Sequence, residues 1–382
     1  MKIVYVTHVV FPDVIWDSFS CLELAKRVGR RGHEVAVLTW NKANPSIHRR
    51  ENIDGVEIWR LAGLNFKFDN FITEYPFLCR MDSILRQMKA DIIHAHSHLF
   101  LTTYQAIKSG SCQEKPTIVT VHGVVAKRHH LVNLAQKAYL FTLASWIFKK
   151  ATTVICLTKS EAIEIMKIGC PSEKIKIIPN AVNIDLFKPQ PVREENLVVW
   201  VGRFVPEKGL EYLIEAAKIV SQRAKNVRFI LIGDGPFRAK IMKLATDLGL
   251  LGKFVRFTGP LKREEVAEIL GRASVFVFPS LREGLPFSVL EAMACGTPVV
   301  GSDVPGIKDL VVNGENGLLV TAKDPKMLAE ALLSLLNDAE LRKEMGRNAR
   351  RLVVAKYGWD SVISKIEKVY YEAINECSLK KS

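Results

Sequence analysis

The sequence predicts an α/β protein made of two doubly wound parallel-sheet domains. Three observations support this fold class: short apolar β-rich runs alternate with helical patterns, the alternation restarts once, and 382 residues exceed one ordinary domain. The usual size of about 100–200 residues per domain then predicts two domains. A hydrophobic share of 48% gives each of them enough apolar residues for a core.

The first half begins with an apolar run that we expect to be a buried strand. Residues 22–32 follow, with apolar side chains at helical spacing and a glycine at the end, which predicts an amphipathic helix. Strands buried on both faces of a parallel sheet are typically near-continuous apolar runs, and this half contains several. The expected strands are 3–6, 35–39, 92–95, 117–121 and 154–157.

A polar, proline-containing stretch, residues 185–196, separates the two halves. The second half has strands expected at 197–201, 227–232, 255–258, 275–279, 298–302 and 317–320. We therefore expect an N-terminal domain at 1–188, a C-terminal domain at 189–358, and a helix in 359–382 that crosses back to pack on the N-terminal domain. Because doubly wound sheets bind ligands beyond the carboxyl ends of their strands, a ligand is expected between the domains.

Lys and Arg outnumber Asp and Glu by 54 to 40, and the net charge of +14 predicts an anionic partner. Nucleic acid, a membrane surface and a phosphorylated small molecule are all open on this ground. The basic residues are not gathered on one motif, which disfavours nucleic acid.

The seven cysteines are scattered without a CxxC pair, which indicates reduced thiols rather than disulfides or a metal site. The longest uncharged apolar run, residues 139–148, is too short to span a bilayer. No signal-peptide pattern follows Met1, so we expect a cytoplasmic protein.

Residues 283–291 contain the most informative motif. Pro286 stands where a first helical residue is favoured, and Gly284 allows the backbone to approach a ligand closely. The free N–H groups of such a helix start attract anions, which suits a diphosphate. Glu283 precedes the helix and Glu291 lies inside it, so both carboxylates are expected to line one pocket wall. A glutamate near a helix start is also common merely because the helix dipole favours it.

Two cations, Arg203 and Lys208, stand on a loop after the first strand of the second domain. They match the charge of a diphosphate without a metal ion, although surface Arg and Lys are more often simply solvated. Residues 233–236 form a Gly-Asp-Gly-Pro turn after another strand. The chain has no Asp-x-Asp pair and no GxxxxGK[ST] loop, which argues against a nucleotide held through dedicated metal carboxylates.

Together these stretches resemble the family 4 retaining glycosyltransferases of the GT-B fold, in which two Rossmann-like domains face each other. The resemblance rests on the Glu-x7-Glu element that starts at Glu283, the loop 202–209 and the turn 233–236. It extends to further landmarks at 32–35, 94–96, 120–123, 292–300, 303–306 and 313–320.

The resemblance implies that a hexose moves, with retention, from a nucleotide-diphosphate sugar to an unidentified lipid-linked, saccharide or small-molecule acceptor. No cofactor or metal is expected to be required. Arg203 and Lys208 are placed on the diphosphate, and Glu291 on the ribose. Glu283 is placed on the donor sugar and His122 beside the reacting carbon. The expected catalytic residues are thus Glu283, His122, Arg203 and Lys208. Further donor contacts are expected from Gly202, Gly233, Asp234, Gly235, Gly284, Leu285, Pro286, Phe287, Ser288 and, more weakly, His96.

One loop departs from the family pattern. Many relatives carry a Gly-Gly turn after the first strand, whereas residues 8–20 contain no glycine here. Ser18 could donate a hydrogen bond to phosphate from this place; a loop packed by Phe11 and Trp16 is the alternative.

The N-terminal half is the more basic one, since residues 1–190 carry 25 Lys and Arg against 16 Asp and Glu, or +9 of the +14. Basic residues at 127–130 and 149–150 flank an aromatic helical stretch, 131–148, which itself contains the basic residue 137. Such a stretch suits contact with an anionic membrane surface, and an amphipathic helix packed on its own sheet is the simpler alternative.

Three other functions compete with a transferase. A nucleotide-sugar epimerase of the same fold needs acid and base residues for elimination, and the motif resembles the transferases instead. A nucleotide-sugar or membrane-surface binding protein without activity is expected to have lost Glu283, Arg203 or Lys208, and all three are present. A nucleic-acid-binding protein predicts salt-sensitive binding of DNA or RNA.

Overall fold

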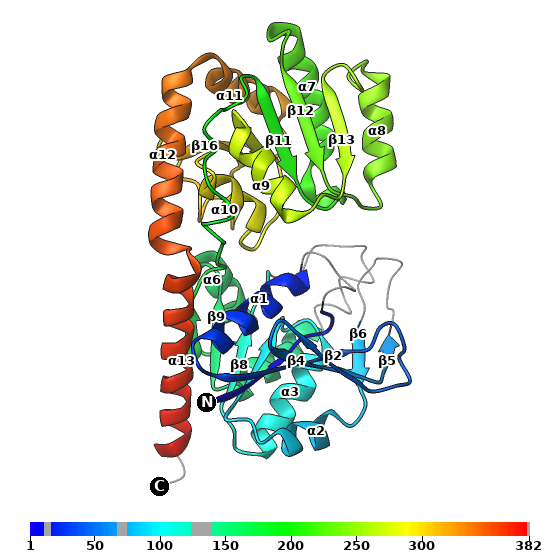
Figure 1. The fold of residues 1–382 in the computed structure, drawn as a ribbon, viewed down its shortest axis with the longest axis vertical. Coiled ribbons are helices and arrows are strands. Elements are labelled where there is room, and N and C mark those ends of the chain that lie inside the picture. Colours follow the sequence, from blue (N-terminus) through cyan, green and yellow to red (C-terminus); the bar gives the residue numbers. More distant parts are fainter. Residues whose placement is uncertain (11–16, 67–74, 124–138, 380–382) are drawn as a thin grey trace. The chain divides into compact units, whose positions relative to one another are not determined.

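The structure, a computed structural model, describes residues 1–10, 17–66, 75–123 and 139–379 (Figure 1). The chain forms two compact units. Unit 1 comprises Met1–Pro179 and Ile363–Ser382, and unit 2 comprises Asn180–Val362. Each unit carries its own large sheet, so the two sheets expected from the sequence are both present.

The large sheet of unit 1 has eight strands in the order β10-β9-β8-β7-β1-β2-β4-β3. Neighbouring strands are parallel, except that β3 and β4 pair antiparallel at one edge. The five strands predicted for this half are confirmed as β1 (Lys2–Val6), β2 (Glu34–Trp40), β7 (Ile92–His96), β8 (Thr117–Thr120) and β9 (Thr153–Cys156). The sheet also contains β3 (Arg49–Ile53), β4 (Val56–Leu61) and β10 (Ile175–Ile177), and a separate antiparallel pair consists of β5 (Gly63–Phe66) and β6 (Tyr75–Leu78).

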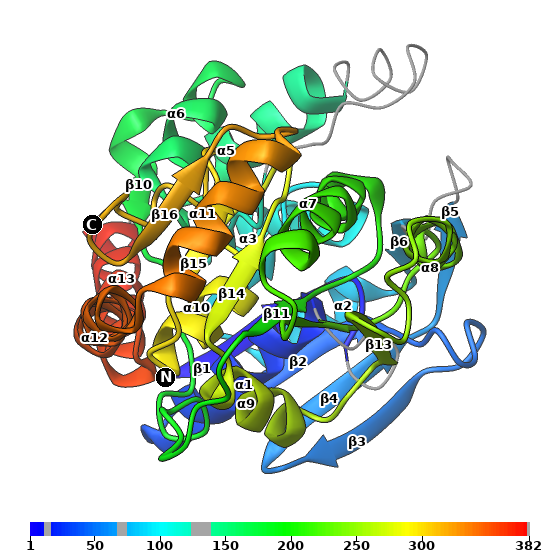
Figure 2. The same cartoon turned by 90° about the horizontal axis from the view of Figure 1, so that it is seen from above.

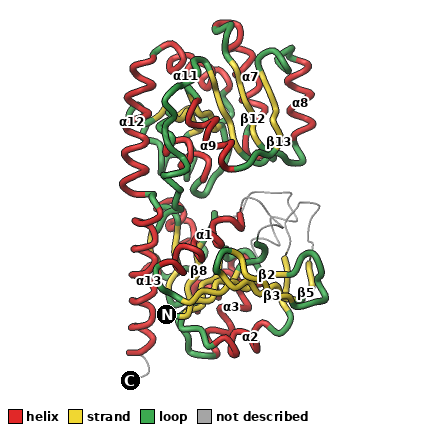
Figure 3. Tube along the Cα trace, in the orientation of Figure 1, coloured by secondary structure: helices red, strands yellow, loops and turns green. Residues whose placement is uncertain are grey.

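The helices of unit 1 connect these strands and cover the sheet (Figure 3). Helix α1 (Asp17–Arg30) begins earlier than the expected start at residue 22, because no glycine or proline stands between Asp17 and that residue. The other helices are α2 (Met81–Met88), α3 (Leu101–Cys112), α5 (Ser145–Lys150) and α6 (Lys159–Lys167), with a π-helical turn at Leu140–Ala144 and a 3-10 turn at Ser172–Lys174.

The C-terminal helix α13 (Trp359–Leu379) belongs mainly to unit 1. The hydroxyl of Tyr370 lies 2.7 Å from that of Tyr5 on β1, and both side chains are fully buried. Glu367, one turn earlier, lies 3.1 Å from His33 Nε2. The helix therefore packs against the sheet of this unit, and only its first residues, 359–362, fall in unit 2.

The sheet of unit 2 has six parallel strands in the order β13-β12-β11-β14-β15-β16, of which Figure 2 labels β13, β11, β14, β15 and β16. Numbered within the unit, this is the doubly wound order 3-2-1-4-5-6, whose switch point lies between the first and fourth strands. The six predicted strands are confirmed as β11 (Leu197–Val201), β12 (Arg228–Ile232), β13 (Val255–Gly259), β14 (Val275–Phe278), β15 (Val299–Ser302) and β16 (Gly317–Val320).

Helices lie on both faces of this sheet (Figure 3). On one face α7 packs against α8 and α11, and α10 packs against α9 and α12 on the other. These helices are α7 (Leu210–Arg223), α8 (Arg238–Asp247), α9 (Arg263–Arg272), α10 (Phe287–Ala294), α11 (Pro325–Asn337) and α12 (Ala339–Lys356), with a 3-10 turn at Pro206–Lys208.

The boundary between the units lies after Pro179, earlier than the expected boundary after residue 188. The polar stretch expected as a linker is held to unit 2 instead. Its Phe187 is fully buried, and the Arg193 guanidinium donates hydrogen bonds to the carbonyls of Cys295 and Gly296, just past α10. Apolar burial and these backbone contacts outweigh the polar composition that indicated a linker.

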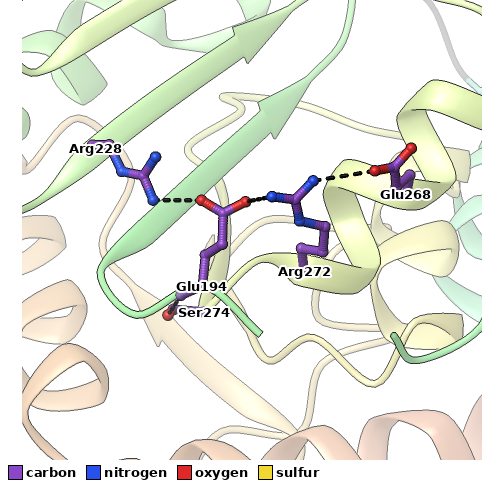
Figure 4. A network of polar contacts seen from close by, with 5 residues as sticks. All are labelled: Glu194, Arg228, Glu268, Arg272 and Ser274. Carbon is purple, nitrogen blue, oxygen red and sulfur yellow. Dashed lines mark hydrogen bonds and ion pairs between the residues drawn. The ribbon is translucent and has the colours of Figure 1, made fainter. Parts of the chain in front are cut away.

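A polar network joins the amino ends of three strands of unit 2 (Figure 4). The Glu194 carboxylate accepts from Arg228, at the start of β12, and from Arg272, at the end of α9. Arg272 also contacts Glu268 at 3.1 Å, and the Ser274 hydroxyl, just before β14, donates to the Glu194 carbonyl at 2.7 Å. This network closes the end of the sheet that lies opposite the candidate site.

Candidate active site

The loops that carry the predicted donor contacts leave β11, β12 and β14 at their carboxyl ends, around the switch point of the unit 2 sheet. Gly233 approaches the loop after β11 so closely that a Cβ atom on it would lie 2.0 Å from the Gly202 carbonyl oxygen. The Phe204 N–H donates to the Asp234 carbonyl at 2.9 Å, and the Leu281 N–H donates to the Glu207 carbonyl at 2.8 Å. Backbone contacts therefore bring Gly202, Gly233 and the segment before Glu283 together.

The structure joins two of the predicted catalytic residues directly. Lys208 Nζ donates to Glu283 Oε1 at 2.6 Å, and the side chains are only 21% and 10% exposed. The same ammonium lies 5.0 Å from the centre of the Phe278 ring, at the end of β14. A partly buried ion pair beside an aromatic face is stronger than a solvated one, because less water competes for the charges.

Arg203 lies on the same loop but is exposed, and within the described part of the chain it forms no ion pair. Its guanidinium is thus available to an anion at this edge of the sheet. Asp234 is also largely exposed, and its carboxylate accepts from the N–H of Gly235 at 2.8 Å, which stabilises the turn.

Helix α10 begins at Phe287, so Pro286 is its N-cap residue and not the first helical residue that we expected. The first N–H groups of an α-helix have no acceptor within the helix, and those of Phe287 and Ser288 stand at this start. The Leu285 carbonyl accepts from the buried Asn180 Nδ2 at 2.8 Å. The loop before the helix is thereby held in place, with Glu283 and Gly284 at its beginning.

Glu291 is buried, with only 1% of the residue exposed. Its Oε1 accepts from the Arg263 guanidinium of α9 at 2.8 Å. Burial raises the pKa of the Glu291 carboxyl, and the Arg263 charge acts in the opposite direction. The two carboxylates of the Glu-x7-Glu element are thus each held by a cation, Lys208 for Glu283 and Arg263 for Glu291.

In unit 1, the structure brings His96 and His122 together at the carboxyl ends of β7 and β8. His96 Nδ1 lies 2.9 Å from His122 Nε2, and the two rings stack at a centroid distance of 5.2 Å. The next N–H, that of Gly123, donates to the buried Glu161 carboxylate at 2.6 Å. His122 is half-buried, whereas His96 is only 5% exposed.

Two predictions fall wholly or partly outside the described residues. Ser18 lies in α1 and not in a loop as expected, while residues 11–16, with Phe11 and Trp16, are outside the described part. The basic residues at 127–130 and 137 are outside it as well. In the described end of the aromatic stretch, Phe148 is fully buried and Phe141 is 62% exposed, so this stretch packs partly on its own domain.

Sequence reasoning missed Arg263 and the partners of the histidines. Arg263 opens α9, and its approach to Glu291 depends on the packing of α9 against α10, which leaves no local signal. His94 Nδ1 lies 2.8 Å from the Tyr370 hydroxyl, and its Nε2 lies 2.7 Å from Thr120 Oγ1. The His-Ala-His spacing of 94–96 was the available signal, because alternate residues of a strand share one face.

Over the described residues, no helix has the length and apolar character that a membrane crossing requires. The same part of the chain contains no group of three or more His, Cys, Asp or Glu residues placed to hold a metal ion.

Comparison with known proteins covers both halves of the chain. The family model described as Glycosyltransferase Family 4 matches residues 19–186, and the one described as Glycosyl transferases group 1 matches residues 183–352. An uncharacterized glycosyltransferase of Methanocaldococcus jannaschii is 31% identical over 290 residues, which cover 76% of this chain and 78% of that protein. The chain is a family 4 glycosyltransferase.

This glycosyltransferase has further relatives of full length. The N-acetyl-alpha-D-glucosaminyl L-malate synthase of Bacillus anthracis is 25% identical over 385 residues, covering 96% of each chain. Sucrose-phosphate synthase from Thermosynechococcus elongatus has a TM-score of 0.80 at 21% identity, covering 98% of this chain and 99% of that one. Anabaena HepE, solved in complex with UDP-glucose, has a TM-score of 0.77 at 19% identity, covering 97% of this chain and 100% of that one. These likenesses show that the fold is GT-B.

Proposed function

We propose that this glycosyltransferase moves a hexose from a nucleotide-diphosphate sugar to its acceptor with retention of the anomeric configuration. The observation that carries the proposal is the Lys208–Glu283 pair, which lies at the switch point of a nucleotide-binding sheet and beside the start of α10. The acceptor is a lipid-linked, saccharide or small-molecule hydroxyl compound.

The electrostatics of unit 2 suit the departure of a nucleoside diphosphate. As the bond between the anomeric carbon and the phosphate oxygen breaks, negative charge grows on the diphosphate. We propose that the cations Lys208 and Arg203 and the first N–H groups of α10 stabilise that charge. Once the phosphate attracts Lys208, Glu283 is released to accept hydrogen bonds from the sugar hydroxyls.

The anomeric configuration is retained if the acceptor attacks the anomeric carbon from the same face that the diphosphate leaves. The acceptor hydroxyl forms the new bond to the anomeric carbon, and its proton goes to the departing phosphate oxygen, so atoms and charges balance without a separate base. A covalent sugar–enzyme intermediate would instead need a second carboxylate about 5 Å from Glu283.

Structural relatives support the choice of donor. HepE of Anabaena, which shares the GT-B fold, is solved with UDP-glucose and with UDP and glucose. We propose that unit 2 of this chain takes the nucleotide part of such a donor, with Arg203 and Lys208 on the diphosphate and Glu291 toward the ribose.

The deciding experiment combines a donor screen with product analysis. A panel of nucleotide-diphosphate sugars is tested for thermal stabilisation and for release of the nucleoside diphosphate. Proton NMR of the product then gives the anomeric configuration. An inverted product would refute the retaining mechanism, and a panel without any stabilisation or release would refute the donor class.

Two further parts of the proposal have their own tests. We propose that the transfer requires no metal ion, since two cations and a helix start offset the diphosphate charge; turnover that persists in excess EDTA supports this.

We also propose a cytoplasmic enzyme that contacts an anionic membrane surface, supported by the exposed Phe141 and by Lys149 and Lys150 further along the same stretch. Co-flotation with anionic but not neutral vesicles is the expected result.

A further inference from the structure

A chain of side-chain contacts, made of hydrogen bonds and one ring stack, runs from the C-terminal helix to His122 along the unit 1 sheet. The Tyr370 hydroxyl of α13 contacts Tyr5 OH at 2.7 Å and His94 Nδ1 at 2.8 Å. The His94 ring stacks on that of His96 with centroids 4.6 Å apart, and His96 Nδ1 lies 2.9 Å from His122 Nε2. His96 is therefore the residue through which this buried cluster contacts His122.

The His96 ring is neutral and fixed in orientation. It is 5% exposed, and the rings of His94 and His122 stack on it. Burial, together with the neighbouring His94 and His122, holds the pKa of His96 well below its usual range. A neutral imidazole carries one proton, on either Nδ1 or Nε2.

The partners of His96 decide between these two tautomers. Its Nε2 is buried and has no hydrogen-bond partner within the described part of the chain. A proton there would be an unsatisfied buried donor, a situation that costs about 1–3 kcal/mol and is rarer in proteins than an unsatisfied acceptor. The proton therefore resides on Nδ1, which donates to His122 Nε2.

We propose that His96 is a positioning residue that holds His122 in the tautomer protonated on Nδ1. Because His122 Nε2 accepts from His96, it has no lone pair left to take a proton from a substrate. With Nε2 engaged by His96 and Nδ1 protonated, the His122 side chain does not act as a general base toward the donor sugar. The place of His122 beside the donor sugar rests on the proposed function; its tautomer does not.

The test is nitrogen NMR of the full chain labelled with ¹⁵N-histidine, without substrate. His122 is assigned by comparison with His122→Asn and His96 by comparison with His96→Asn. We expect the Nδ1 signals of both residues at the position of a protonated ring nitrogen and both Nε2 signals at that of an unprotonated one. An Nε2-protonated His122 at neutral pH would overturn the proposal, whether or not a donor sugar has been found.

Kinetics of two matched variants give a second readout. The amide of Asn in His96→Asn can replace the Nδ1–H donor, whereas His96→Leu removes it at similar volume. We expect His96→Leu to lower kcat at least 10-fold with little change in the KM for the donor, and His96→Asn to recover most of kcat. Equal losses in both folded variants would show a merely structural role, and failure of the wild type to turn over any donor would count against the proposed function instead.

Discussion

Lys208 Nζ lies 2.6 Å from Glu283 Oε1, although the two residues stand 75 positions apart in the chain. One is expected to bind the diphosphate and the other the sugar, so in the free enzyme the two groups neutralise each other. Donor binding must exchange this contact for two new ones. The ion pair keeps both side chains near their working positions, which lowers the conformational entropy lost on binding.

Removing either partner of this pair should abolish catalysis without unfolding the protein. For Lys208→Met and Glu283→Gln we expect nucleoside diphosphate release to fall by roughly 100-fold or more, the usual effect of losing one group that stabilises the transition state. Lys240→Met is the matched control, because Lys240 also lies 2.6 Å from a glutamate, Glu211, but is 63% exposed. The rates are measured by coupled diphosphate release. Wild-type rates in both site variants would show that Lys208 and Glu283 do not belong to the catalytic site.

The buried Glu291 should make stability depend on pH. Burial raises the pKa of its carboxyl in the folded protein, so the stabilising contribution of this group is complete below the unfolded value of about 4.3 and is lost as the pH rises through the folded pKa. At neutral pH the ionised carboxylate costs stability. We expect Glu291→Gln to melt at a higher temperature than the wild type there, with the gap closing toward about pH 4.

Glu291→Gln should also bind nucleoside diphosphates more weakly. The neutral Gln amide lacks the second, negatively charged oxygen that the Glu291 carboxylate would offer to the ribose hydroxyls. Glu330→Gln, on the surface of unit 2, is the control and should change neither property. Calorimetric melting across the pH range and titration with nucleoside diphosphates are the measurements. A lower melting temperature for Glu291→Gln at neutral pH would contradict the assigned pKa direction.

A methyl group at Gly306 should damage the site, and one at Gly314 should not. Both glycines have φ near +82°, so both alanine variants carry the same backbone strain, of roughly 1–2 kcal/mol. Only at Gly306 would the new Cβ lie 2.0 Å from the Gly284 carbonyl oxygen, forcing the loop that holds Glu283 to move. We therefore expect Gly306→Ala to lose donor turnover while Gly314→Ala loses only stability. Equal donor turnover in the two variants would show that the loop holding Glu283 accommodates the new methyl group without loss of function.

Loss of a single hydroxyl should loosen the attachment of α13 to its unit. Tyr370→Phe leaves the hydroxyl of Tyr5 and Nδ1 of His94 buried without this partner, so we expect the free energy of unfolding to fall by about 1–3 kcal/mol. The neighbouring Tyr371 is 54% exposed, and Tyr371→Phe should be neutral. Urea unfolding of both variants makes the comparison, and a Tyr370→Phe protein as stable as the wild type would contradict it.

The central strands could be predicted from the sequence because strands buried on both faces are continuous apolar runs, as in Leu197–Val201. Strand β3 (Arg49–Ile53) lies at the edge of its sheet with mostly exposed or half-buried residues, so its composition resembles that of a loop. The sequence predicts a boundary after residue 188, later than the observed one after Pro179, because the contacts of Phe187 and Arg193 with distant residues leave no trace in local composition.

The candidate site was predictable only in part. The loops of Lys208 and Glu283 follow strands that neighbour each other across the switch point, so their meeting follows from the doubly wound order. The contact of Arg263 with Glu291 depends on how two helices pack, and the burial of Glu291 follows from the same packing. The partner of His94 comes from α13, 276 residues further along the chain, where no motif indicates it.

Unit 1 is assembled from two separate parts of the chain, Met1–Pro179 and Ile363–Ser382, with unit 2 inserted between them. For the engineering of hybrid enzymes, unit 2 is therefore a cassette with two junctions and not a C-terminal half. A chimera that exchanges everything after residue 179 would replace Tyr370 and Glu367, the residues that contact Tyr5, His94 and His33. Exchange of residues 180–362 alone would change the loops proposed to bind the donor and leave the core of the host unit intact.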